Sequence, residues 1–105
     1  MNNYNSINTL WIDDTPGLPI ESILLNTPLL DRVRLVNTTW SVSNEDNLRT
    51  IFEKLKKCSG LDANGNTTDM AVVTGYVEID SISEKLLEEL NEYFKELIVV
   101  VDGKA

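Results

Sequence analysis

Histidine is absent from this 105-residue sequence, and cysteine occurs once, at Cys58. The lack of histidine removes Ser-His-Asp and Cys-His catalysis and the commonest protein ligand of transition metals. A single cysteine excludes an internal disulfide and a cysteine-based zinc site. An enzyme built from this chain would have to use carboxylates, lysine or tyrosine alone. We therefore expect no catalytic residues, no metal site and no cofactor.

Basic residues are scarce: 9 lysines and arginines stand against 17 acidic residues, a net charge of −8. Nucleic acids and anionic membranes bind basic surfaces, so we expect neither as a partner. No apolar run approaches the roughly 20 residues of a membrane-spanning helix, which argues against membrane insertion. The segment 1–6 lacks the basic flank and apolar core of a secretory signal, and the location of the protein stays open. The length is typical of one domain, 1–105.

Apolar residues recur at one spacing in four short segments. The central segment has Leu30, Val33 and Leu35 in the pattern L-x-x-L-x-L, with charged residues between them. Such alternation predicts a half-buried strand. The same positions recur 23 residues upstream, 44 residues downstream and a further 22 residues downstream, at Ile7, Leu10 and Ile12, then Val77 with Ile79, and Val99 with Val101. The expected strands are 7–12, 31–36, 70–79 and 97–101.

Helical patterns separate these strands. A short helix is expected from Pro19, and the apolar residues from Leu48 to Cys58 predict one face of a second helix with Ser43 as N-cap. Cys58 is expected to be a small core residue. A capping box, Ser81 with Glu84, predicts the start of a third helix. The segment 61–69 is expected to be a loop, Trp40 to lie in a connection, and Gly75 to mark a bulge or a close approach.

Strands joined through helices indicate a parallel sheet, and the regular interval between them indicates stacked coils. At this point the chain resembles the leucine-rich repeat family, whose motif is L-x-x-L-x-L-x-x-N-x-L. The first three apolar positions of the motif match two triplets, which are Ile7, Leu10, Ile12 and Leu30, Val33, Leu35. The usual asparagine is replaced by Thr15 and Thr38, and the later copies keep only two apolar positions each. The irregular repeats are also loosely similar to modules of bacterial surface and phage structural proteins.

The resemblance implies an α/β solenoid with a parallel four-stranded sheet on one side and helices on the other. It also implies a binding role without catalysis, directed at a protein or a carbohydrate. Side chains that alternate with the buried ones would point outward. If the strands stack in repeat order, Trp11, Arg34 and Glu78 form one outward row, with Arg32 beside Tyr76 in the next row. The alternative is a modest Arg34–Glu78 ion pair, with Trp11 packed under the N-terminal tail.

Three smaller motifs are candidate sites of other kinds. Asp62 opens a stretch of alternating oxygen-bearing residues that is similar to a calcium loop, but it lacks the required glycine and glutamate positions, and a tight turn is expected. Asn37 and Asn66 fit the glycosylation acceptor pattern, yet we expect both to be structural. The carboxylate pair Asp13–Asp14 is expected to lie in a solvated turn.

The sequence thus favours a non-catalytic recognition module. The alternative is a structural subunit of a larger assembly, or a fragment of a longer array, that associates through exposed sheet edges. The strand 97–101 supports this alternative because it is apolar and an uncovered edge invites pairing with another chain. A third possibility is a small carboxylate-based enzyme.

Overall fold

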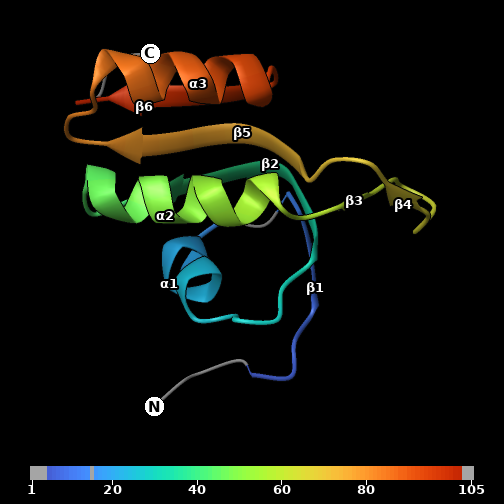
Figure 1. Ribbon diagram of the computed structural model, residues 1–105. Coiled ribbons are helices and arrows are strands. Elements are labelled where there is room, and N and C mark those ends of the chain that lie inside the picture. The colour runs from blue at the N-terminus through green and yellow to red at the C-terminus, as the bar shows by residue number, and fades with distance from the viewer. Residues whose placement is uncertain (1–4, 15, 103–105) are drawn as a thin grey trace.

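The computed structural model describes residues 5–14 and 16–102. Four parallel strands form a sheet in the order β1-β2-β5-β6, and β3 and β4 form a separate antiparallel pair (Figure 1). The elements, in chain order, are β1 (Thr9–Asp13), α1 (Ile20–Leu25), β2 (Arg32–Ser41), α2 (Glu45–Lys56), β3 (Gly60–Leu61), β4 (Thr67–Thr68), β5 (Val72–Ile79), α3 (Glu84–Tyr93) and β6 (Leu97–Val101).

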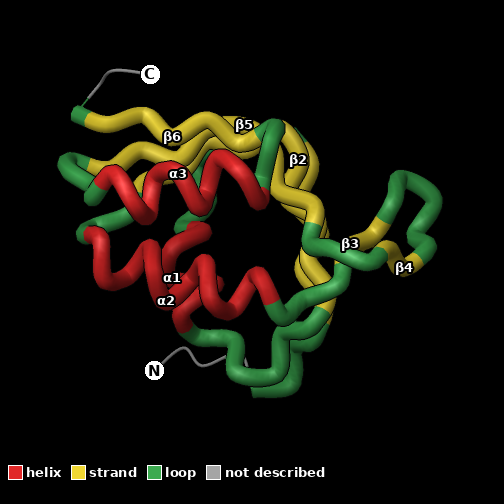
Figure 2. Tube along the Cα trace, turned by 45° about the horizontal axis from the view of Figure 1, so that its top comes forward, coloured by secondary structure: helices red, strands yellow, loops and turns green. Residues whose placement is uncertain are grey.

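All three helices lie on the same face of the sheet (Figures 1 and 2). The alternation of the strands explains this arrangement, because Val33, Leu35 and Val77 are fully buried between the sheet and the helices. The expected α/β class with a four-stranded parallel sheet is therefore confirmed. A leucine-rich-repeat-like solenoid is a finer expectation that this architecture does not establish.

The strand register agrees with two of the three predicted intervals. Leu10 pairs with Val33 across β1 and β2, as the spacing of their segments predicts. Val77 pairs with Val99 across β5 and β6, which the last interval predicts. The interval between the second and third strands is wrong, because Val77 stands opposite Trp40 and not opposite Val33. The strand β5 therefore lies further along β2 than repeat stacking predicts.

A bulge in β2 explains why this strand is longer than expected. Asn37 adopts a φ of 58°, and the pairing with β5 shifts between Leu35 and Thr38. The extra residue reverses the facing of everything after it, because side chains alternate along a strand. Trp40 consequently faces the core and is 5% exposed. The predictions that the strand ends at Val36 and that Trp40 lies in a connection are both wrong.

At Gly75 the backbones of β5 and β2 come close together, as the sequence suggested. A Cβ atom built on this residue would lie 2.0 Å from the backbone oxygen of Thr38, and the φ of Gly75 is 111°. Only glycine adopts such a φ at little cost. Gly75 thus lets β5 approach the strand just after the bulge.

The helix starts differ from the predicted ones by one or two positions. Asn44, rather than Ser43, caps α2 by accepting the N–H of Asn47, and Ser83, rather than Ser81, caps α3 by accepting the N–H of Leu86. The predicted apolar face of α2 is confirmed, and Phe52 lies 5.7 Å from Tyr93, centroid to centroid, in an edge-to-face arrangement. This contact fixes α2 beside α3.

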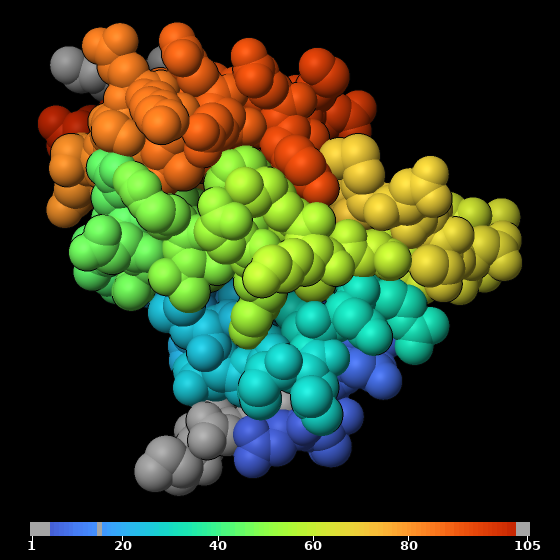
Figure 3. Space-filling view, viewed as in Figure 1, coloured from blue at the N-terminus to red at the C-terminus, as the bar shows by residue number. Residues whose placement is uncertain are grey.

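The segment 61–69 is not a plain loop, because β3 and β4 make a short hairpin that projects beyond the body of the molecule (Figure 3). The turn of this hairpin contains Gly65, with a φ of 87°. The Asn-Gly sequence there favours a tight reversal. The hairpin lies between α2 and β5 in the chain, beside the amino end of the sheet.

Candidate binding surface on the open face of the sheet

The face of the sheet that turns away from the helices has no second layer among the described elements (Figure 2). The β3–β4 hairpin covers this face only near Trp11 and Arg34. Parallel sheets occur almost always with both faces covered. An open face with large apolar side chains is therefore a candidate interaction surface. The exposed side chains on it are those of Trp11, Asp13, Thr39, Ser41, Tyr76, Glu78 and Ile98.

The most exposed apolar part of this face lies on β5 and β6. Tyr76 pairs with Ile98 across the two strands, and the two side chains are 46% and 42% exposed. Thr39 of β2 stands on the other side of Tyr76. In a neighbouring row, the hydroxyl of Ser41 donates to Oε1 of Glu78 at 3.0 Å. The result is an aromatic–aliphatic patch with a polar border.

Trp11 and Arg34 form a second cluster, nearer the hairpin. They are directly paired across β1 and β2, and the guanidinium carbon of Arg34 lies 5.2 Å from the centroid of the Trp11 ring. Nη1 of Arg34 donates to the carbonyl oxygen of Leu61 at 2.9 Å, and its Nε lies 3.4 Å from Oδ1 of Asp13. Nε1 of Trp11 donates to Oδ2 of Asp13 at 2.7 Å. Arg34 thus ties the hairpin to the sheet.

The five residues singled out from the sequence do not make one continuous site. Arg34 stands opposite Val72, while Glu78 stands opposite Ser41, so the predicted Trp11–Arg34–Glu78 row and the alternative Arg34–Glu78 ion pair are both wrong. The reason is the register of β5, which follows from the bulge and not from a repeat.

The predicted neighbours Arg32 and Tyr76 are also separate. Arg32 pairs with Thr9 and bridges to Ser59, and its ion pair is a long one of 3.8 Å with Asp31. The proposed packing of Trp11 under the N-terminal tail concerns residues 1–4, which lie outside the described residues.

Thr39 and Ser41 belong to the open face but were missed in the sequence. The error came from ending the strand at Val36. The stretch from Thr38 to Val42 does carry the signal, since Trp40 and Val42 alternate with polar residues and β-branched residues are dense there. The bulge concealed it, because it interrupts the period-two pattern of the whole strand.

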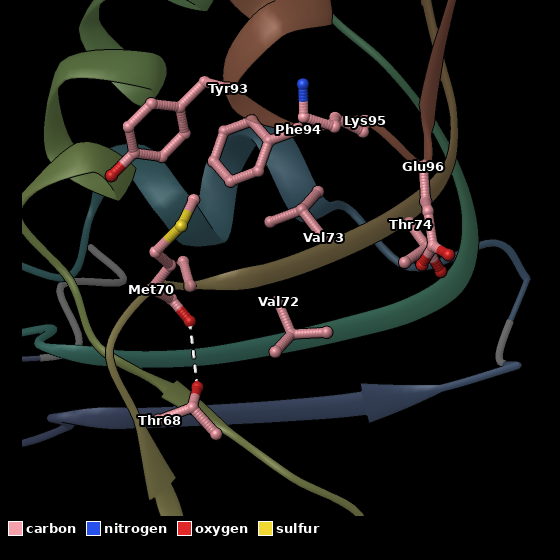
Figure 4. Close-up of a pocket in the computed structure, with 10 residues that line it drawn as sticks. Thr68, Met70, Val72, Val73, Thr74, Tyr93, Phe94, Lys95 and Glu96 are labelled. Atoms are coloured by element: carbon pink, nitrogen blue, oxygen red, sulfur yellow. Dashed lines mark hydrogen bonds between the residues drawn. The ribbon is translucent and has the colours of Figure 1, made fainter.

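A shallow apolar groove of about 440 Å³ lies at the amino end of β5 (Figure 4). Met70, 43% exposed, extends toward the rings of Tyr93 and Phe94, with Val73 below them. The hydroxyl of Thr68 donates to the carbonyl oxygen of Met70 at 3.0 Å and fixes this end of the hairpin. The groove offers mainly apolar surface, and the charged residues that line it are Lys95 and Glu96.

The calcium-like motif at Asp62 forms a turn through hydrogen bonds to the backbone. Oδ1 of Asp62 accepts the N–H groups of Asn64 and Asn66, both at 2.9 Å, and the backbone hydrogen bond from Asn66 is the main reason why the pKa of Asp62 is lowered. Its carboxylate therefore closes the expected turn. In the described ranges 5–14 and 16–102, no cluster of three potential metal-ligating side chains is found.

The carboxylate pair Asp13–Asp14 is split between two structural roles. Asp13 contacts Trp11 and Arg34, whereas Oδ1 of Asp14 accepts Nδ2 of Asn37 at 2.7 Å. The contact with Asp14 helps to hold Asn37 in the bulge. The two carboxylates thus contact different partners.

Cys58 is buried, as expected for a core residue. Its thiol faces the carbonyl oxygens of Lys54 at 3.3 Å and Leu30 at 3.6 Å. Burial raises the pKa of the thiol, and the nearby Asp31 raises it further. A thiol held in its neutral form is a poor nucleophile.

Comparison with known protein families, with curated proteins and with solved structures found no match to this chain. Across the part of the chain that the structure describes, no helix has the length and apolar character needed to cross a membrane.

Proposed function

We propose that this chain is a non-catalytic recognition module, built as a short leucine-rich-repeat-like array, that binds a protein through the open face of its sheet. The observation that carries the proposal is the exposed Tyr76–Ile98 pair on a parallel sheet that lacks a covering layer among the described elements. The order of the strands along the chain and the placement of the helices on one face support the array.

A protein fits this face better than a glycan does. The centre of the patch is formed by an aromatic ring beside Ile98, with half-buried Val36 and Val100 in neighbouring rows. Aromatic anchors surrounded by a polar border are typical of protein interfaces. A glycan requires many convergent hydrogen-bonding groups, and here Ser41 and Glu78 already bond to each other.

The test compares two variants by quantitative affinity capture, followed by titration of each purified partner. Tyr76→Ala with Ile98→Ala should remove the partner, while the melting temperature stays close to that of the wild type because both side chains are half exposed. Leu29→Ala is the matched control, since Leu29 is an exposed leucine (61%) outside the sheet. A partner that binds the Tyr76 and Ile98 variant with unchanged affinity would refute the proposal, as would a specific signal on glycans alone.

A second candidate function is assembly through the β6 edge. The strand β6 consists of five apolar residues without lysine, proline or a bulge, the devices that usually protect an edge. Within residues 5–14 and 16–102, no strand lies beyond it. This edge could hold the chain in a larger structure while the open face stays available.

A further inference from the structure

Successive helices are linked by a repeated contact between a glutamate and a serine. Glu21, in the first turn of α1, accepts the backbone N–H of Ser43 at 2.8 Å and its hydroxyl at 3.0 Å, one with each carboxylate oxygen. Nδ2 of Asn47 donates to the same carboxylate at 2.9 Å. Partial burial alone would raise the pKa of Glu21, but these three hydrogen bonds outweigh it and the pKa is lowered.

The same geometry recurs one helix further. Glu45, the first residue of α2, accepts the backbone N–H and the hydroxyl of Ser83, both at 2.9 Å, again one with each oxygen. Arg49 donates to this carboxylate and is the main cause of the lowered pKa of Glu45. Each helix thus holds the N-terminal end of the next one, and the amino ends of α2 and α3 lie side by side (Figure 1).

We call Glu21 and Glu45, each of which binds a serine before the next helix, the glutamate ladder. Glu84 is the next glutamate at the start of a helix, and its carboxylate binds no serine among the described residues. It is the first residue of α3, the position that Glu45 has in α2, and its side chain is exposed. It makes no hydrogen bond or ion pair within the described part of the chain. The offset within each helix differs, because Ser43 stands two positions before Glu45 and Ser83 stands one position before Glu84. At the other end of the series, α1 is preceded by Pro19, which has neither an N–H nor a hydroxyl to offer.

The neighbouring strand is open on the same flank. The carbonyl oxygen of Glu96 accepts the N–H of Gly75, and the N–H of Asp102 donates to Ile79, so these residues of the β6 segment face β5. The N–H and C=O groups alternate in direction along a strand, and those of Val99 therefore point to the free edge, as do those of Val101. An unpaired strand edge recruits another strand.

We propose that the α3–β6 flank binds a helix–strand unit of a partner protein. The helix begins with a serine or threonine, whose N–H and hydroxyl Glu84 accepts, and the strand that follows pairs in parallel with Val99 and Val101. A second copy of this chain does not fit, since its free strand, β1, has no helix before it among the described residues. The inference rests on the second proposed function, assembly through β6, and is independent of the open face.

The chain itself supplies a probe of the right chemistry. The segment 80–101 contains α3 and β6. Its length equals the number of residues that separates Gly75 on β5 from its partner Leu97 on β6. A second copy of this segment, inserted directly after Val101, places an added Ser83 next to the original Glu84 and an added strand next to β6. Hydrogen exchange and urea unfolding then report whether the flank accepts the unit.

In the extended protein, the amides of Val99 and Val101 should exchange on the order of tenfold or more slowly than in the parent, because they become hydrogen-bonded. Glu84→Gln should lower the urea midpoint of the extended protein more than that of the parent, where only the interaction of a first-turn acid with the helix dipole is lost. Ser83→Ala in the added copy should lower the urea midpoint of the extended protein as Glu84→Gln does. The double variant should be no less stable than either single variant, because both changes remove the same contact. Glu88→Gln, an exposed position on the same helix, is the control and should change neither protein.

Unchanged exchange at Val99 and Val101, or equal effects of Glu84→Gln and Glu88→Gln in the extended protein, would overturn the proposal. Dimerisation of the unmodified protein in analytical ultracentrifugation, abolished by Val101→Pro, would overturn it in favour of a second copy as the occupant. Val101→Pro removes an edge donor without touching the β5 ladder. None of these results affects the open-face proposal, whose test uses Tyr76 and Ile98.

Discussion

Replacing Arg34 by methionine tests whether this residue is chiefly structural. The arginine side chain is only 15% exposed, and it holds the carbonyl oxygen of Leu61, the carboxylate of Asp13 and the ring of Trp11 at once. Methionine keeps much of the aliphatic stem but loses the charge and every donor. The hairpin should then detach from the sheet and the protein should be less stable.

The size of the effect can be worked out from these contacts. A hydrogen bond to a charged group contributes about 1.5–3 kcal/mol, a partly exposed ion pair about 0–1 kcal/mol and a cation–π contact about 0.5–1 kcal/mol. Because the three contacts share one side chain, their contributions overlap, and we expect a total loss of about 2–3 kcal/mol. For a domain of this size, the melting temperature should fall by about 10–20 °C.

Urea unfolding of Arg34→Met gives the change in free energy, and limited proteolysis at the 62–66 turn reports release of the hairpin. The matched control is Arg32→Met on the same strand, because the contact of Arg32 with Asp31 is long and both side chains are well exposed. Its expected loss is below about 0.5 kcal/mol. If Arg34→Met cost no more than Arg32→Met and the turn stayed resistant to protease, the anchoring role would be refuted.

Two further predictions concern the bulge and the glutamate ladder. Gly75→Ala should destabilise the protein by roughly 3 kcal/mol or more, because the new methyl group meets the backbone of Thr38 and the φ of 111° is strained; a melting temperature within about 3 °C of the wild type would contradict this. Glu21→Gln should be less stable than the wild type at pH 7. The lowered pKa of Glu21 means that its stabilisation is present above the ordinary pKa of 4.5 and is lost as the pH falls through the lower, folded-state pKa, so the gap in urea midpoints should narrow toward pH 3. A gap that stays constant from pH 7 to pH 3 would count against this role.

The local patterns predicted the parallel strands and the helical faces well. Period-two alternation around Val33 and Leu35 and the 3.6-residue spacing from Leu48 to Leu55 depend on neighbouring residues only, and both patterns are found buried as expected. The predicted pairing of β1 with β2 and of β5 with β6 is confirmed. In each pair, one compact crossover joins the two strands, so their register depends on a short stretch of chain.

The candidate site was predicted less well. Trp11 and Arg34 do lie side by side, but Glu78 is elsewhere and Thr39 was missed. Both errors follow from one extra residue at Asn37, whose left-handed conformation is supported by contacts with Asp14 and Thr74. A bulge that depends on partners from two other segments has only a weak local signature.

The order of residues along this chain was enough to predict four parallel strands, the helical faces and the lack of histidine and disulfide chemistry, because these follow from composition and from short-range periodicity. It did not predict the second half of β2 or the β3–β4 hairpin. The pairing of β2 with β5, the capture of the hairpin by Arg34 and the ladder that ends at Glu84 arise from contacts between segments far apart in the sequence. Such contacts depend on which groups meet after the chain has packed. The register of the sheet placed Tyr76 beside Ile98, and the position of α3 as the last described helix left Glu84 without a partner among the described residues.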